Sequence, residues 1–340
     1  MSEIAIIGAG AWGTALSIVL GRKGTHRVRL WVYEKELCEN IAKHRVNQNF
    51  LHGQQIPESV VPCSDLSQTL ADASIVVSVM PSQHCRRLFE QMRPYLLDEA
   101  IIVSATKGLE EHSLLRMTEV ISQTLNTNHK KSRRIGALSG PSFALEVARG
   151  DPTAITIASA DSELARLVQR EFSDASFRVY TNDDPIGVEL GGALKNTVAI
   201  AAGVCSGLGL GHNSIAGLVT RGLAEMTRLV VACGGKAETM AGLAGLGDLV
   251  LTCTGNLSRN RTVGVELGRG RKLPEILAGM HGMVAEGVFT TTAALQLARA
   301  RGVDMPITEQ MFAILQEGKA PREAIYELMT RSGKSEKLQA

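Results

Sequence analysis

The sequence has almost no excess of charge of either sign. Its 36 lysines and arginines nearly balance its 34 aspartates and glutamates, which leaves a net charge of +2. Charge this evenly balanced gives no overall attraction to nucleic acid or to an anionic membrane. We therefore expect neither as a partner, and any basic binding site has to be local.

The six cysteines stand singly in the sequence. There is no CxxC pair, and no group of cysteine and histidine has the spacing of a zinc site. The sequence therefore predicts no metal centre. Scattered single thiols are typical of a protein of the reducing cytoplasm.

The sequence also lacks a recognisable leader and a long hydrophobic run. It begins MSEIAIIGAG, without the basic n-region, apolar h-region and cleavage signal of a secretory leader. The longest apolar-looking run, residues 197–210, is rich in glycine and well short of the about 20 residues that span a membrane. We expect a cytoplasmic protein with no membrane span.

Length and pattern predict two domains. A chain of 340 residues exceeds the size at which one hydrophobic core keeps growing. Residues 1–183 alternate short apolar strands with helices, interrupted by a less regular stretch at residues 46–62, whereas residues 184–340 show almost no convincing strand. We expect an α/β domain with a mostly parallel sheet over residues 1–183, followed by an all-helical domain over residues 184–340.

The chain opens with a glycine-rich turn between an expected strand and an expected helix. In this context Gly8 allows a tight turn, Gly10 lets the backbone approach a pyrophosphate, and Gly13 permits close packing of the helix. Free N–H groups at the helix start favour phosphate. The pattern predicts a Rossmann-type dinucleotide-binding domain, and a plain turn between strand and helix is the alternative.

The choice of coenzyme rests on charges after the second expected strand. Glu34 lies 21 positions after Gly13, near the place where an acidic side chain would bind a ribose 2′-hydroxyl and favour NAD. Lys35 and Arg45 would equally accommodate the 2′-phosphate of NADP. A role on a helix surface explains the three charges as well, so NAD and NADP both stay open.

The helical half contains a lysine among small and apolar neighbours. On a helix, the residues that contact Lys195 are Gly191, Gly192, Val198 and Ala199. None of them can neutralise a charge, and two glycines inside a helix indicate that something approaches the backbone closely. Lys195 either reaches solvent along a packed helix or is a partly desolvated proton donor beside a ligand.

Two loops follow expected strands of the first domain. Lys107 lies in the loop after the strand over residues 100–104, at the end where ligands bind in doubly wound sheets, although a loop lysine is often only solvated. After the strand over residues 134–139, Pro141 is suited to a first helical turn, and the backbone N–H groups of residues 140–144 are available to bind an oxygen.

Two polar clusters interrupt the helical half. Asp248 and Thr252 are four residues apart and would share one helix face, although Asp248 could also be a helix N-cap. Residues 255–261 read as a loop with two arginines and several amide or hydroxyl donors, which suits a phosphate or a carboxylate unless the turn is merely solvated. Glu286 lies in a later turn whose purpose the composition does not reveal.

These features together predict hydride transfer on an anionic substrate. A nicotinamide coenzyme would supply the hydride chemistry, so the protein has to supply a proton donor for the developing alkoxide and a clamp for the anion. A lysine suits the first task, because burial lowers its pKa and its charged form stabilises negative oxygen. The scheme requires no metal.

The combined motifs resemble one family, the bacterial NAD(P)-dependent glycerol-3-phosphate dehydrogenases of the biosynthetic type. The matching segments span nearly the whole chain in the expected order. They are IIGAGAWGTAL at residues 6–16, ATKGLE at 105–110, SGPSFA at 139–144, GGALKN at 191–196, GLGDLVLTCTGNLSRNRTVG at 245–264 and VAEGV at 284–288.

The resemblance implies a fold and a reaction. The fold is a Rossmann domain followed by a helical domain of the 6-phosphogluconate-dehydrogenase-like type. The reaction is the reversible reduction of dihydroxyacetone phosphate, a phosphorylated triose, to sn-glycerol 3-phosphate with NADH or NADPH. It takes place in the cytoplasm and supplies the backbone precursor of phospholipids. Helical second domains in such enzymes often pair, so we expect a homodimer.

The resemblance also implies roles for individual residues. Lys195 matches the proton donor in reduction and acceptor in oxidation, with Asp248 as its partner and Thr252 in support. The positions that match substrate contacts are Lys107, Gly140, Ser142, Lys195, Asp248, Ser258, Arg259 and Asn260. Besides Gly8, Gly10 and Gly13, the positions that match cofactor contacts are Ala11, Trp12, Tyr33, Lys107, Ala144, Arg259, Val284 and Glu286.

Two other functions compete with this interpretation. One is a dehydrogenase of the same architecture that acts on the carboxylate of a hydroxy acid; residues 258–260 argue for phosphate instead, because three oxygens need several donors. The other is a sensor that binds the coenzyme without catalysis and contacts a protein partner through its helical half. Lys195 in a small, apolar setting argues against a sensor, which does not need it.

Overall fold

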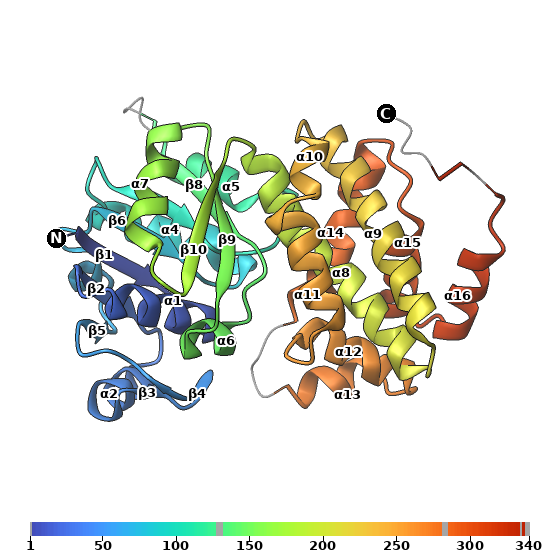
Figure 1. The fold of residues 1–340 in the computed structure, drawn as a ribbon, viewed down its shortest axis with the longest axis horizontal. Helices are drawn as coiled ribbons and strands as arrows, with labels where there is room; N and C mark the ends of the chain where they lie inside the picture. The colour runs from blue at the N-terminus through green and yellow to red at the C-terminus, as the bar shows by residue number, and fades with distance from the viewer. Residues whose placement is uncertain (1, 127–131, 281–284, 334, 337–340) are drawn as a thin grey trace. The chain divides into compact units, whose positions relative to one another are not determined.

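The computed structural model describes residues 2–126, 132–280, 285–333 and 335–336 (Figure 1). The chain forms two compact units. Met1–Thr106 and Met117–Pro185 make up the first, called here the sheet unit, and Lys107–Arg116 and Ile186–Ala340 make up the second, the helical unit. The sequence predicts one division, between residues 183 and 184, and so places Lys107–Arg116 in the first domain, whereas the structure groups this segment with the helical unit.

An eight-stranded sheet forms the centre of the sheet unit. Its strand order is β10-β9-β8-β7-β6-β1-β2-β5, so the order reverses at β1, which pairs with both β2 and β6. All neighbouring pairs are parallel except β8 and β9, which agrees with the expected mostly parallel sheet. The strands are β1 Ser2–Ile7, β2 His26–Trp31, β5 Val60–Cys63, β6 Ile75–Ser78, β7 Ile101–Ser104, β8 Ile135–Ser139, β9 Thr153–Ala158 and β10 Phe177–Asn182.

The stretch expected to be irregular contains strands. Within residues 46–62, β3 (Val46–Asn47) and β4 (Leu51–Gln55) form a small antiparallel pair, and β5 begins at Val60 as an edge strand of the main sheet. These strands are short and partly exposed, so their sequences lack the continuous apolar run of a central parallel strand.

Helices cover the sheet because its strands are apolar on both faces. All four residues of β6 and all four of β7 are buried, which is the pattern of parallel strands between two helical layers. The helices are α1 Ala11–Arg22, α2 Lys35–His44, α3 Leu66–Leu70, α4 Cys85–Met92, α5 Met117–Leu125, α6 Ala144–Arg149 and α7 Ser162–Phe172, with short 3-10 turns at Ser82–His84 and Arg93–Tyr95.

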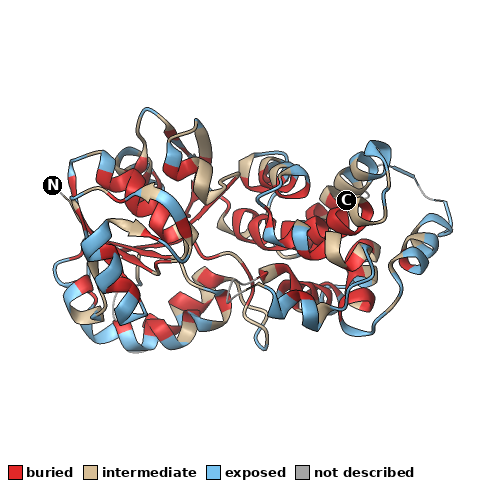
Figure 2. Ribbon diagram, turned by 90° about the horizontal axis from the view of Figure 1, so that it is seen from below, coloured by how far each residue is buried: buried red, intermediate tan, exposed pale blue. Residues whose placement is uncertain are grey.

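Within the described residues from 186 onward, the regular elements of the helical unit are helices, arranged around α8 (Pro185–Gly207). The others are α9 His212–Ala232, α10 Ala237–Met240, a π-helical turn at Leu243–Gly247, α11 Asp248–Thr254, α12 Arg259–Gly268, α13 Leu273–Ala278, α14 Glu286–Ala300, α15 Pro306–Gln316 and α16 Pro321–Met329. Every residue of α8 from Gly187 to Cys205 is buried (Figure 2). This helix is long and apolar enough to cross a membrane, but its apolar window is wholly buried in the unit, as in a core helix.

Two pairs of glycines let α8 and α12 touch through their backbones. A Cβ built on Gly203 would lie 2.1 Å from the Arg261 carbonyl oxygen, and one on Gly264 would lie 2.0 Å from the Ile200 carbonyl oxygen. Gly207 and Gly268 repeat the contact one turn further along. Because any side chain at these positions would collide with backbone, the glycines fix how closely the two helices approach.

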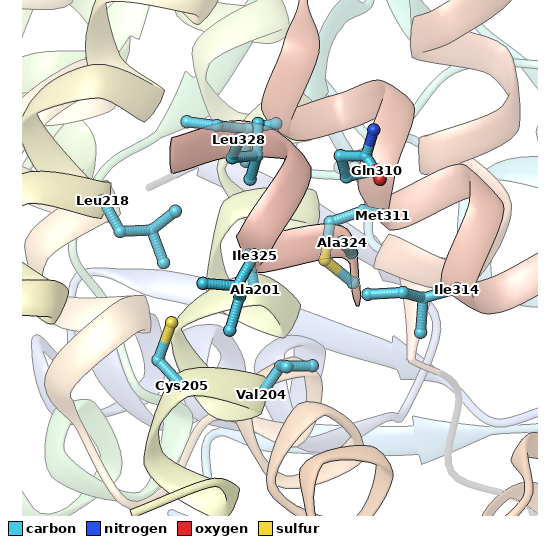
Figure 3. Close-up of a pocket in the computed structure, with 11 residues that line it drawn as sticks. Ala201, Val204, Cys205, Leu218, Gln310, Met311, Ile314, Ala324, Ile325 and Leu328 are labelled. Carbon is cyan, nitrogen blue, oxygen red and sulfur yellow. The ribbon is translucent and has the colours of Figure 1, made fainter. Parts of the chain in front are cut away.

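A small cavity lies between α8, α9, α15 and α16 (Figure 3). Most of the side chains that line it are apolar, such as Val204, Leu218 and Met311, and Gln310 contributes an amide. None of the residues that the sequence assigns to a site lines it. A phosphorylated or charged ligand needs converging donors, so this cavity does not have the character of a substrate site.

Candidate active site

Lys195 is buried in the middle of α8. Its residue is 6% exposed, and its ammonium group donates hydrogen bonds to Asp248 Oδ1 at 2.5 Å and to Thr252 Oγ1 at 2.7 Å. Both partners lie on α11. The alternative in which Lys195 follows the helix out to solvent is therefore wrong.

Gly191 explains how Asp248 comes within reach of Lys195. A Cβ on Gly191 would lie 2.7 Å from the Ala244 carbonyl oxygen, in the π-helical turn directly before α11. Glycine lets this turn press against α8 and thereby sets α11 opposite Lys195. The close approach inferred from the sequence is thus the approach of another segment of the same unit.

Asp248 joins two ammonium groups. Its Oδ1 accepts from Lys195, and its Oδ2 accepts from Lys107 Nζ at 2.7 Å. Its side chain does not cap a helix, because Gly247 occupies the N-cap position of α11 and Asp248 is the first helical residue. The N-cap alternative for Asp248 is therefore wrong, whereas the expected sharing of one helix face with Thr252 is confirmed by the bond from Thr252 Oγ1 to the Asp248 carbonyl at 2.6 Å.

The surroundings of Lys195 shift its acidity. The pKa of Lys195 is lowered from 10.5 to about 8: burial is the largest cause, Asp248 opposes it, and the positive charge of Lys107 adds to the lowering. Such a lysine is charged at neutral pH and close enough to its pKa to exchange a proton there. The arrangement can therefore act as a proton donor or acceptor and can stabilise negative charge on an oxygen.

The second polar cluster lies at the start of α12. Residues 255–261 are only partly a loop: Ser258 is the N-cap of α12, with its Oγ accepting from the Arg261 N–H, and Arg259 and Asn260 form the first turn. Arg259 is exposed. Desolvation lowers the pKa of Arg259, and the negative charge of Glu286 opposes this effect. A guanidinium in contact with solvent stays charged.

Asn260 ties three segments of the helical unit together. Its Nδ2 donates to Asn196 Oδ1 at 2.9 Å, and its Oδ1 accepts from the Gly287 N–H at 3.0 Å in the first turn of α14. Asn196 has no signal of its own in the sequence, although it directly follows Lys195 in the GGALKN segment. Glu286 is the first residue of α14, and Val284 lies outside the described residues.

The glycine turn of the sheet unit has the geometry of a phosphate-binding turn. Gly8 has a φ of +122°, and a Cβ there would lie 2.0 Å from the Val79 carbonyl oxygen. A Cβ on Gly13 would lie 1.9 Å from the Gly8 carbonyl oxygen, so α1 packs directly on the turn. By contrast, nothing lies within 4 Å of a Cβ on Gly10, and no side chain caps α1 there, which leaves space and N–H groups for a phosphate.

Three other residues expected to contact the cofactor lie at the start of α1 and after β2. Ala11 and Trp12 begin α1; the Trp12 ring packs on Phe177 with centroids 6.5 Å apart, and its buried Nε1 has no hydrogen-bond partner in the described part of the chain. Tyr33, after β2, is 70% exposed and meets the Trp31 ring edge-on. Open space at Gly10 and an unsatisfied donor at Trp12 fit a dinucleotide in this turn.

The loop after β8 differs from the expectation in one respect. Gly140 has a φ of +138°, and Ser142 Oγ donates to the Gly140 carbonyl at 2.9 Å. The helix α6 begins at Ala144, so Pro141 precedes it by three residues and does not occupy its first turn. Ser142 and the N-cap residue Phe143 separate the proline from the helix, and a proline in the sequence does not by itself fix at which of the following residues a helix starts.

Comparison with known proteins gives one consistent result. Two family models match: NAD-dependent glycerol-3-phosphate dehydrogenase N-terminus over residues 3–165, and NAD-dependent glycerol-3-phosphate dehydrogenase C-terminus over residues 184–326. Curated relatives named glycerol-3-phosphate dehydrogenase [NAD(P)+] include one from Koribacter versatilis, 65% identical over 99% of both chains, and one from Acidobacterium capsulatum, 54% identical over 99% of this chain and all of that one.

A solved structure agrees with the sequence matches. The crystal structure of glycerol-3-phosphate dehydrogenase from Coxiella burnetii superposes with a TM-score of 0.92 at 42% identity, covering 97% of this chain and 99% of that one. The match extends over both units, and it confirms the expected fold of a Rossmann-like domain followed by a helical domain. The chain therefore belongs to the NAD-dependent glycerol-3-phosphate dehydrogenase family.

Proposed function

We propose that this chain interconverts dihydroxyacetone phosphate and sn-glycerol 3-phosphate, with Lys195 as the group that exchanges the proton. The reaction is that of the family. The observation that carries the role of Lys195 is its burial beside Asp248 and Thr252, with a pKa lowered to about 8. A buried ammonium with this pKa suits proton transfer to a ketone oxygen at neutral pH.

The proposed mechanism divides the work between coenzyme and chain. When bound, the nicotinamide coenzyme supplies the hydride to the substrate carbonyl carbon in reduction and accepts it in oxidation. The Lys195 ammonium gives its proton to the developing alkoxide, and Asp248 keeps that ammonium oriented through Oδ1. Lys107, bound to Oδ2 of the same carboxylate, adds a second positive charge that stabilises the negative oxygen.

Further residues are proposed to bind substrate and coenzyme. In the helical unit, Ser258, Arg259 and Asn260 would contact the substrate with Lys107, Lys195 and Asp248, and Arg259, Glu286 and Val284 would contact the coenzyme with Lys107. The support is chemical, because guanidinium, hydroxyl and amide groups suit a phosphate. In the sheet unit, Gly140 and Ser142 would contact the substrate, and the proposed coenzyme contacts are Gly8, Gly10, Ala11, Trp12, Gly13, Tyr33 and Ala144.

The pH dependence tests the proton-exchange role. Because the reduction needs the ammonium form of Lys195, we expect its kcat to be level below about pH 7 and to fall as the pH rises through about 8. Oxidation needs the neutral amine, so its kcat should rise through the same pH and then level off. Steady-state rates in both directions, at saturating coenzyme and substrate, measure both limbs; limbs centred near the ordinary lysine value of 10.5 would contradict the proposal.

Choice of substrate separates the proposed function from its two rivals. Oxidation should be fast with glycerol 3-phosphate and at least about 10³-fold slower in kcat/KM with glycerate, since a site built for phosphate leaves its donors unpaired without one. Equal rates would favour the hydroxy-acid dehydrogenase. Coenzyme binding without turnover of either compound would favour the sensor. Running the assay with NAD⁺ and NADP⁺ separately determines the coenzyme preference.

We further propose that the protein is a cytoplasmic homodimer whose product supplies phospholipid synthesis. All six cysteines are free thiols, which suits a reducing compartment. Several large apolar side chains of the helical unit are exposed and suit contact with a second copy; they are Val231, Leu277, Phe289, Tyr326 and Met329. Light scattering at micromolar concentration would give the mass of a dimer, whereas a monomer mass would contradict this part of the proposal.

A further inference from the structure

The segment Lys107–Arg116 leaves the sheet unit after β7 and returns to it at α5, yet its contacts place it in the helical unit. It is closed on itself by an antiparallel bridge between Leu109 and Arg116 and by a hydrogen bond from the Glu110 N–H to the Leu115 carbonyl at 3.0 Å. The closed part, residues 109–116, is eight residues long, and Lys107 precedes it by two residues. Because Leu109 faces Arg116 across the bridge, a displacement of Arg116 would also move the chain two residues after Lys107.

The Arg116 end is attached to α8 by a largely buried ion pair. Arg116 Nη1 donates to Glu189 Oε2 at 2.5 Å, and the two side chains are 14% and 6% exposed. Across the bridge, Leu109 is buried in the hydrophobic cluster that includes Leu190 and Leu194 of the same helix. Charge and apolar packing thus hold the closed loop against α8, within two turns of Lys195.

The Lys107 end of the same loop reaches the reactive cluster. Lys107 Nζ binds Asp248 Oδ2 at 2.7 Å, and Asp248 Oδ1 binds Lys195. We propose that Arg116 and Glu189 are positioning residues: their ion pair fixes the segment Lys107–Arg116 on α8 and thereby holds the Lys107 ammonium against Asp248. This inference rests on the proposed function of Lys195 and Asp248.

The positioning has a consequence that a purely structural ion pair would not have. The charged and titratable groups that face Lys195 are Asp248 and Cys253 of α11 and Lys107 of the loop. Lys107 lowers the pKa of Lys195 through like-charge repulsion, and it also shares the carboxylate that stabilises the Lys195 ammonium. If the loop loses its anchor and Lys107 withdraws, both effects favour the ammonium form, so the pKa of Lys195 rises.

The Arg116–Glu189 ion pair is called the anchor here, and variants of either residue are anchor variants. The test compares the pH–rate profiles of anchor variants with that of Lys107→Met. In Lys107→Met we expect a lower kcat and an alkaline limb of the reduction profile displaced upward by about half a pH unit or more. Arg116→Met and Glu189→Gln should displace the limb in the same direction and lower kcat/KM for dihydroxyacetone phosphate about tenfold. Arg116→Lys should recover part of both, because it keeps the charge at the anchor.

Additivity and a control complete the test. Adding Arg116→Met to Lys107→Met should displace the limb no further, because both act through one ammonium group. Arg331→Met, which removes an exposed ion pair with Asp304 elsewhere in the helical unit, should leave the profile unchanged. Anchor variants with lowered thermal stability but an unmoved alkaline limb would overturn the inference. An unmoved limb in Lys107→Met itself would instead contradict the proposed site. If Arg116→Met fails to fold, Glu189→Gln decides.

Discussion

Replacing Lys195 with alanine is expected to lower kcat for the reduction of dihydroxyacetone phosphate by about 10³-fold or more. The substitution removes both the proton donor and one of the two positive charges beside Asp248. Asp248 keeps its ion pair with Lys107, so the carboxylate is not left without a partner. Coenzyme binding, followed by the quenching of protein fluorescence, should stay close to that of the wild type.

Chemical rescue distinguishes a lost proton donor from a disturbed structure. Removal of the lysine side chain leaves space in α8, and a small primary amine such as methylamine can occupy it and provide an ammonium group. We expect added amine to restore part of the rate in Lys195→Ala and to have no effect on the wild type. Lys272→Ala, a substitution of an exposed lysine in the same unit, should retain full activity.

The opposite result would assign Lys195 a different role. If Lys195→Ala keeps kcat within tenfold of the wild type and amines do not change it, the lysine acts only as a buried partner of Asp248. The pH limb near 8 should then also persist in the variant. Activity and pH profile therefore have to change together for the proton-exchange role to stand.

The local pattern of the sequence was sufficient to predict most elements of the fold. The apolar strands β6 and β7 and the glycine turn before α1 each have a signal within a few residues. The direction of β9, which runs antiparallel to β8, has no such signal, because alternating strands and helices look alike whichever way a strand enters the sheet. Ser258 is a typical N-cap residue, so the start of α12 does have a local signal in the sequence.

The site was predicted residue by residue but not as an arrangement. Lys195 was notable because its helical neighbours cannot neutralise it, yet its partner lies 53 residues away and Lys107 lies 141 residues before that partner. Which acid meets which base depends on the packing of α11 against α8, and that depends on the absence of a Cβ at Gly191. The ion pair between Arg116 and Glu189 has no sequence signal. It depends on a segment that belongs to the helical unit, although the residues before and after it in the chain belong to the sheet unit.

Replacing Gly264 with alanine is expected to lower the free energy of unfolding by about 3 kcal/mol or more. The new Cβ would lie 2.0 Å from the Ile200 carbonyl oxygen and 2.9 Å from the Gly203 Cα, so it meets backbone that no side-chain rotation can move. The two helices have to separate. Urea unfolding monitored by circular dichroism measures the loss.

The same substitution should also reduce the affinity for substrate. Asn260 on α12 reaches Asn196 on α8 across the same helix contact, at 2.9 Å, and separation of the helices lengthens this bond. We expect KM for dihydroxyacetone phosphate to rise more than kcat falls, because the hydrogen bonds between the Lys195 ammonium and Asp248 and Thr252 run to α11 and not to α12. A Gly264→Ala protein that is destabilised while its KM is unchanged would show that Asn260 keeps its place by other contacts, such as its bond with Gly287.

Gly217→Ala is the matched control, because it adds the same methyl group to another helical glycine. Gly217 lies on α9, is exposed, and has no atom within 4 Å of its Cβ position. Alanine there should raise the free energy of unfolding by up to about 1 kcal/mol, since it loses less backbone entropy than glycine on folding. Helix propensity favours alanine at both positions. If the free energy of unfolding rises in Gly217→Ala but falls in Gly264→Ala, the fall is caused by the backbone contact between α8 and α12. Equal stabilisation by both substitutions would mean that the two helices do not touch at this point.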